Sequence, residues 1–154
     1  MDMTKQIVTK RLQPDASGYT VVAGTSTPLS STVVDTAGAE SVRFIVGFGA
    51  ITSGGAQSVE VQQGAASNMS DGADLLGTNV TVVDTDDNRL VIIEVVHPRE
   101  RYLRTQINRA TQNSVIDFEI VELYYPRKAP VTQDTDTIVA AGVEVHASPA
   151  EGTA

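Results

Sequence analysis

Apolar and polar residues alternate along much of this chain, as they do in β-strands that bury one face. The alternation is clearest in residues 41–50 and 57–63. Shorter segments at 19–23, 29–34 and 79–83 also have strand character, and turns rich in Gly, Ser and Asp separate them. Because residues 52–55 form a strong turn signal, we expect residues 44–63 to form a β-hairpin.

Residues 89–125 are the most apolar part of the chain and predict three consecutive strands, at 89–96, 102–109 and 114–125. The first strand is apolar at nearly every position, which is more than one buried face requires. Pro98 separates it from the second, because proline cannot donate a ladder hydrogen bond. In the third strand the apolar phase changes after Ile120, which indicates either a bulge or a strand end that is buried on both faces.

About eight short strands with polar turns predict an all-β fold, an antiparallel β-sandwich or jelly-roll-like domain over residues 19–125. Residues 1–18 are expected to form an N-terminal arm or edge strand. The period of two places the following residues in the core: Phe44, Val46, Val59, Val61, Leu90, Ile92, Leu103, Ile107, Ile116, Phe118 and Ile120.

Residues 126–154 differ in composition from the rest and begin with a linker that contains two prolines. Their few large apolar residues cannot form a core, so the segment is either a disordered tail or an extended arm that a partner orders. We expect an arm that crosses to a neighbouring subunit or to a larger assembly by strand addition, through Ile138, Val139, Val143 and Val145.

Composition disfavours several classes of function. The chain has 19 acidic and 11 basic residues, a formal charge of -8, which is unfavourable for binding nucleic acid. The absence of cysteine removes disulfides and thiolate metal sites. No apolar run has the length of a membrane span and no signal peptide is expected, so a membrane partner is not predicted.

The sequence contains no convincing catalytic or metal-binding motif. Asp84, Asp86 and Asn88 alternate like the start of a calcium loop, but Arg89 and Val95 stand where that loop requires glycine and glutamate. They are a weak cation candidate beside the simpler interpretation of a solvated turn. We find no Gly-x-Ser-x-Gly elbow, and we expect no catalytic residue and no cofactor.

Basic residues concentrate in two places near the end of the chain. They are candidates for docking an acidic surface, and an equally simple interpretation is that they pair with neighbouring acidic residues such as Glu100 and Asp117. The candidates are Arg99, Arg101, Arg104, Arg127 and Lys128.

Four segments together resemble the head decoration, or capsid cement, proteins of tailed bacteriophages: 35–42, 49–52, 97–104 and 126–130. The resemblance implies a non-enzymatic β-rich virion protein on the outer surface of the capsid, where it stabilises contacts between capsomers. It also implies the major capsid protein as a partner, and a homotrimer as the state of self-association.

An alternative of another class is a virion-displayed module for host recognition or carbohydrate binding. It would need an aromatic groove, for which the chain offers Tyr19, Tyr102, Tyr124 and Tyr125 besides its phenylalanines. A third possibility, a hydrolase, lacks both a nucleophile motif and a recognisable carboxylate pair.

Overall fold

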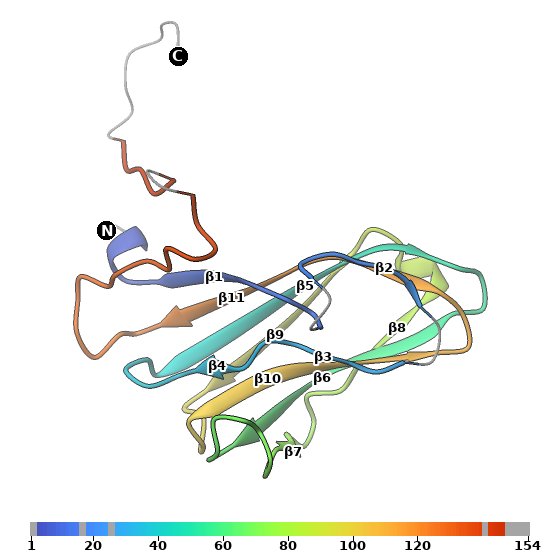
Figure 1. Ribbon diagram of the computed structural model, residues 1–154, viewed down its shortest axis with the longest axis horizontal. Helices are drawn as coiled ribbons and strands as arrows, with labels where there is room; N and C mark the ends of the chain where they lie inside the picture. The colour runs from blue at the N-terminus through green and yellow to red at the C-terminus, as the bar shows by residue number, and fades with distance from the viewer. Residues whose placement is uncertain (1–2, 16–17, 25–26, 140–141, 147–154) are drawn as a thin grey trace, which may run out of the picture.

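The computed structural model describes residues 3–15, 18–24, 27–139 and 142–146. Two antiparallel β-sheets pack together as a β-sandwich, and the described residues contain no α-helix, only two short 3-10 turns (Figure 1). The first sheet has the order β1-β11-β5-β9, with β2 also pairing with β11. Its strands are β1 (Val8–Leu12), β2 (Val21–Gly24), β5 (Ser41–Ile51), β9 (Leu90–Val96) and β11 (Ser114–Tyr124).

The second sheet has the order β3-β10-β6-β7, with β4 beside β10 and β8 beside β6. Two long strands at its centre carry short strands on both sides. Its strands are β3 (Leu29–Ser30), β4 (Val34–Asp35), β6 (Ala56–Gly64), β7 (Ala73–Asp74), β8 (Val80–Val83) and β10 (Tyr102–Ala110).

The predicted hairpin over residues 44–63 is wrong. β5 pairs with β9 and β11, whereas β6 pairs with β7, β8 and β10, so the turn after β5 carries the chain from one sheet to the other. Both strands have a buried apolar face, and these faces meet across the sandwich instead of lying side by side. β9, β10 and β11 alternate between the sheets in the same way.

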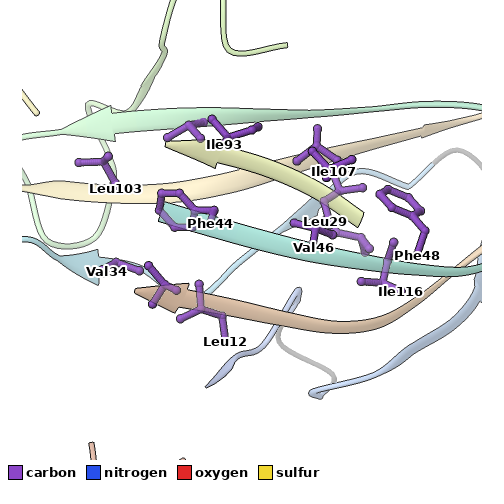
Figure 2. Close-up of a cluster of buried hydrophobic side chains, with 14 of the residues drawn as sticks. Leu12, Leu29, Val34, Phe44, Val46, Phe48, Ile93, Leu103, Ile107 and Ile116 are labelled. Atoms are coloured by element: carbon purple, nitrogen blue, oxygen red, sulfur yellow. The ribbon is translucent and has the colours of Figure 1, made fainter. Parts of the chain in front are cut away.

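The core lies between the inner faces of the two sheets, as Figure 2 shows for the side chains that it labels. β5 contributes Phe44, Val46 and Phe48, and opposite them β10 contributes Leu103 and Ile107. These residues are at most 2% exposed, so the period of two predicted the inward positions of the central strands correctly.

The predicted burial of Leu90 and Ile92 is wrong, because they are 54% and 55% exposed. Val91 and Ile93 are buried in their place, opposite Val46 and Phe44 of β5. Periodicity could not choose between the two faces of a strand that is apolar throughout. The register with β5 decides, since directly paired residues lie on the same face of a sheet.

The predicted core positions of Phe118 and Ile120 are also wrong. The register between β11 and β5 shifts between Ser114 and Ile116 and again between Ile116 and Phe118. The change of phase therefore lies before Ile120, whereas the sequence had indicated a change after this residue. Beyond these irregularities the buried positions are Glu119, Val121 and Leu123, and Phe118 and Ile120 lie on the outer face, only partly buried.

The C-terminal segment contains no strand within its described residues, and its first part lies against β1 of its own chain (Figure 1). The backbone N–H groups of Thr9 and Arg11 donate to the side-chain oxygens of Gln133 and Thr137, both at 3.1 Å. Val131 N donates to Lys5 O at 3.0 Å. This part therefore folds back on its own domain, contrary to the prediction that the arm crosses to a neighbour instead.

Candidate interaction surface

The outer face of the second sheet is polar and internally hydrogen-bonded. On β10 and β6, Arg104 Nε donates to Gln62 Oε1 at 2.8 Å, and Asn108 donates to Glu60 at 2.9 Å. We call this outer face the polar face. Its side chains already hydrogen-bond to one another, as expected of a surface that faces water.

The outer face of the first sheet is largely apolar, which is unusual for a sheet surface open to solvent. We call this patch the apolar face. The cross-strand registers place Ile45 of β5 between Ile120 of β11 and Ile92 of β9. One row further, Gly47 lies between Phe118 and Leu90. The apolar face comprises Ile45, Leu90, Ile92, Val96, Phe118 and Ile120, of which Leu90, Ile92 and Val96 are more than half exposed.

Gly47 lets the Phe118 ring lie flat against the apolar face. A Cβ atom at position 47 would stand 2.5 Å from Phe118 Cε1, which is closer than atoms can approach. The ring therefore occupies the space that a side chain on β5 would fill. This packing of an aromatic ring over a cross-strand glycine keeps the apolar face smooth at its centre.

A charged row borders the apolar face. Arg43 of β5 lies between Glu122 of β11 and Glu94 of β9, and it forms an ion pair with Glu122. The Tyr124 hydroxyl donates to the same Glu122 carboxylate at 2.5 Å. Burial and the nearby Glu122 carboxylate raise the pKa of the Tyr124 hydroxyl, so it remains a donor. An apolar centre beside a polar border is the usual anatomy of a protein interface.

The predicted basic residues divide among three places. Arg99, Arg101 and Arg127 line one cavity of about 390 Å³ at the end of the sandwich, together with Glu100 and loop residues 36–40, which include Glu40. Arg104 lies on the polar face. Lys128 lines an adjoining cavity beside Arg127. The structure thus brings three of the five predicted residues together.

The loops around this end cavity are tied to one another by backbone hydrogen bonds. His97 N donates to Glu40 O and Arg127 N donates to Gly38 O, both at 2.8 Å. Segments 35–42, 97–104 and 126–130, which carry the resemblance to decoration proteins, therefore meet in space. Of the three arginines, Arg101 is already bound: its guanidinium contacts both Asp35 carboxylate oxygens, at 2.7 and 2.8 Å. This contact lowers the pKa of Asp35.

In the acidic turn before β9, the carboxylates accept hydrogen bonds from backbone N–H groups and so stabilise the loops around this turn. Asp84 accepts from Gly54 N at 2.8 Å, and Asp86 accepts from Val83 N and pairs with Arg89. Asn88 has a positive φ of 58°, a conformation that asparagine tolerates in turns. Within the described residues no cluster of three or more acidic, histidine or cysteine side chains is arranged to hold a metal ion.

Of the four apolar residues predicted as contacts in the C-terminal arm, two line a cavity of the same chain and two are exposed to solvent. Ile138 and Val143 line a shallow cavity of about 370 Å³ with Ile7 and Thr9 of the same chain. Val139 and Val145 are exposed at 78% and 59%. Within its described residues, 126–139 and 142–146, the arm thus offers isolated apolar side chains and no continuous apolar surface.

The four tyrosines lie apart. Tyr102 belongs to the second sheet and Tyr124 to the first, and each has an arginine over its ring, Arg101 at 5.2 Å and Arg43 at 5.0 Å. Tyr19 precedes β2, and Tyr125 is 70% exposed after β11. Aromatic residues on different elements do not line one groove of the kind that carbohydrate binding needs.

A carboxylic acid that the sequence pattern did not reveal lies in the centre of the sandwich. Glu119 is fully buried on the inner face of β11, where Thr105 Oγ1 of β10 donates to its Oε1 at 2.6 Å. Burial raises the pKa of Glu119 to about 7, against the opposing effect of the Thr105 and Ser31 hydroxyls. The signal was present as a glutamate in an apolar strand, but the misplaced phase of β11 assigned it to solvent.

Comparison of the sequence with models of known protein families and with curated proteins finds no match to either. None of the helical turns in the described residues has the length or apolar character of a membrane-spanning helix. The candidate site therefore rests on geometry: a β-sandwich with one apolar and one polar outer face, and an arginine-lined cavity at one end.

Proposed function

We propose that this chain is a non-enzymatic structural protein of a bacteriophage virion, a decoration or cement protein that binds the outer surface of the capsid. Its partner in this proposal is the major capsid protein. The observation that supports a binding role is the contrast between the two outer faces of the sandwich, since only the first sheet presents a broad apolar surface.

Burial of the apolar face would supply the energy of attachment. Moving a leucine or isoleucine side chain from full exposure to full burial contributes roughly 1.5–3 kcal/mol. Leu90 and Ile92 are 54% and 55% exposed, so covering each of them would contribute about half of that. The charged row of Glu122, Arg43 and Glu94 lies at the border, where ion pairs serve orientation more than affinity. Attachment through one sheet leaves the hydrogen-bonded polar face directed to solvent.

The arginine-lined cavity at the end of the sandwich gives this attachment a second contact. Arg99 and Arg127 project from loops that backbone hydrogen bonds hold in place, so that little conformational freedom is lost when an acidic segment binds there. A capsid surface with acidic groups at this position would be recognised by charge, and its binding would weaken as salt increases.

The experiment is a binding assay with capsids that lack the bound protein. Ile45→Glu places a charge at the centre of the apolar face, and Gln106→Glu places the same charge on the polar face as a matched control. We expect Ile45→Glu to bind at least about 10-fold more weakly, because a carboxylate would be buried without a partner. The control should bind like the unmodified protein. Circular dichroism first establishes that both variants are folded.

Two results would contradict the proposal. The folded Ile45→Glu variant could occupy capsids as fully as the unmodified protein, which would exclude the apolar face as the contact. The unmodified protein could also fail to bind capsids at any concentration, which would exclude the capsid as the partner.

A further inference from the structure

β9 is a long strand at the edge of a sheet, and its outer side is open. It pairs with β5 on one side, and no strand among the described residues pairs with it on the other. Its seven residues contain no proline, lysine or bulge, which commonly protect an exposed edge, and Glu94 is its one charged side chain. Edges of this kind pair readily with another strand.

The other sheet edges are protected. Along β1, the side chains of Gln133 and Thr137 accept hydrogen bonds from the outward N–H groups of Thr9 and Arg11. The remaining edge strands among the described residues are β2 of the first sheet and β3, β4, β7 and β8 of the second, which have two to four residues each. Short strands offer few consecutive backbone groups to a partner. β9 is therefore the edge on which a continuous ladder can form.

The hydrogen bonds to β5 show which backbone groups of β9 face outward. Phe48 N donates to Arg89 O and His97 N donates to Glu40 O, so the odd-numbered residues of β9 bond to β5. In an antiparallel pair the hydrogen-bonded residues alternate. The even-numbered residues consequently direct their N–H and C=O groups toward the open edge: Leu90, Ile92, Glu94 and Val96.

We propose that β9 pairs in antiparallel fashion with β9 of a second copy of this chain, about a two-fold axis that passes beside Ile93. In this register Leu90 lies opposite Val96 of the second copy, and Ile92 lies opposite Glu94. All four even-numbered residues find hydrogen-bonded partners, which gives about eight bonds across the interface. A register centred on Ile92 leaves Val96 without a strand partner and forms fewer bonds.

The side chains agree with this register. On the inner side Val91 lies opposite Val95, and the two copies of Ile93 lie opposite each other, so apolar residues meet apolar residues. Glu94 does not face its own copy. The pairing joins two first sheets into one, and places both apolar faces on the same side of it.

The ends of β9 are complementary in charge. An acidic turn with Asp84, Asp86 and Asp87 precedes the strand, with Asp86 paired to Arg89, and Arg99 and Glu100 follow the strand. Antiparallel pairing brings the acidic turn of each copy to the basic end of the other, and Asp87 and Arg99 are equally distant in sequence from Ile93. Opposite charges therefore approach at both ends of the interface.

A small cavity of about 200 Å³ supports the choice of this edge. It is lined by residues of β8 and β9, among them Val80 and Leu90, and it reaches Phe48 of the core. Val80 and Val83 of β8 are also partly exposed, at 38% and 39%. A second copy that pairs with β9 would cover the side of the sandwich on which these apolar groups lie.

This inference deepens the proposed function, because the paired copies would present one doubled apolar face to a capsid. Only this use of the dimer rests on the proposed function, and the pairing itself does not. Its test uses the purified chain without capsids, so either proposal can fail alone. The pairing is two-fold, and it replaces the trimer that the family resemblance implies with a dimer.

The test is sedimentation equilibrium of the full chain and of Ile92→Pro. The proline removes an N–H that faces the open edge and leaves the bonds from β9 to β5 intact, and edge strands tolerate proline. Because of the two-fold symmetry the substitution removes two such donors per dimer, so we expect the dissociation constant of the dimer to rise about 100-fold or more. Ile45→Glu alters the apolar face without altering the edge, and should remain dimeric.

Two further measurements keep the proposal testable if the proline variant is unfolded. Arg99→Glu should weaken the dimer about 10-fold at low salt. Hydrogen exchange should show concentration-dependent protection of the amides of the even-numbered β9 residues, whereas the odd-numbered ones are protected at all concentrations. A monomer at high concentration, a trimer, or a dimer unaffected by both Ile92→Pro and Arg99→Glu would overturn the proposal.

Discussion

Replacing Glu119 by glutamine should change how the stability of this protein depends on pH. Glu119 is fully buried between the sheets, and its pKa is raised from 4.5 to about 7. In the unfolded chain the same carboxyl has its ordinary pKa. Folding therefore favours the protonated acid, because an ionised carboxylate in this position loses its hydration.

The sign and size of the effect follow from linkage. The contribution of Glu119 to stability is complete below pH 4.5, falls as the pH rises through the folded pKa near 7, and is then constant. Each pH unit between the two pKa values corresponds to about 1.4 kcal/mol, so the interval amounts to about 3 kcal/mol. The lowered pKa values of Asp35, Asp71 and Asp134 act below pH 3.8 and do not overlap with this window.

Glutamine has the shape of the protonated acid and does not ionise. We expect Glu119→Gln to match the unmodified protein near pH 4.5, and to be more stable by about 3 kcal/mol at pH 8. The assay is urea unfolding followed by circular dichroism at pH 4.5, 6 and 8. Glu60→Gln on the polar face is the matched control and should leave the shape of the profile unchanged.

The reasoning would be refuted if the unmodified protein were as stable at pH 8 as at pH 4.5 while Glu119→Gln behaved identically. It would also be refuted if the glutamine variant were destabilised equally at every pH, because the carboxyl would then have a structural role that its protonation does not control.

Two other changes have definite expected outcomes. Gly47→Ala should destabilise the fold by about 1–3 kcal/mol, because its Cβ would collide with the Phe118 ring. Phe118→Ala in the same chain should remove most of that cost. Thermal unfolding of the single and double variants measures the coupling, and simple additivity of their effects on stability would contradict the contact. A chain that ends at Lys128 should lose about 1–2 kcal/mol of unfolding free energy and show faster hydrogen exchange at Thr9 and Arg11, because it lacks their hydrogen-bond acceptors. A chain that ends at Val139 keeps these acceptors and should show neither effect. Equal exchange in the two chains would exclude the contact with β1.

Most strands could be predicted from the sequence because their alternation is a local property. Residues 41–50, 57–63 and 102–109 show a buried face in every second position, and the structure places strands there. The distribution of strands between the sheets could not be predicted in this way. The turn after β5 suits a hairpin and a crossover equally well, and only the partners of β5 and β6 distinguish them.

The errors at β9 and β11 also have physical causes. A strand such as 90–96, with apolar residues on both sides, has no preferred face until its register with β5 is fixed. In β11 the irregularity before Phe118 reverses the faces, and nothing in the local pattern marks its position. Most of the apolar face comes from these two strands, and four of its residues had been placed in the core: Leu90, Ile92, Phe118 and Ile120.

The basic residues illustrate a third limit. Arg99, Arg101 and Arg127 were predicted as a group from their type alone, and the structure brings them around one cavity. The approach of Arg127 depends on the path of the chain after β11, which no local pattern specifies. That Arg101 is already bound to Asp35 depends on a contact between residues 66 positions apart.

Electron cryomicroscopy of capsids incubated with the purified protein tests the proposed function most directly. We expect additional density on the outside of the shell, into which the sandwich fits with Ile45, Ile92 and Phe118 of the first sheet against the capsid. The same density fitted with the polar face of β6 and β10 against the shell, or capsids without additional density at saturating protein, would contradict it.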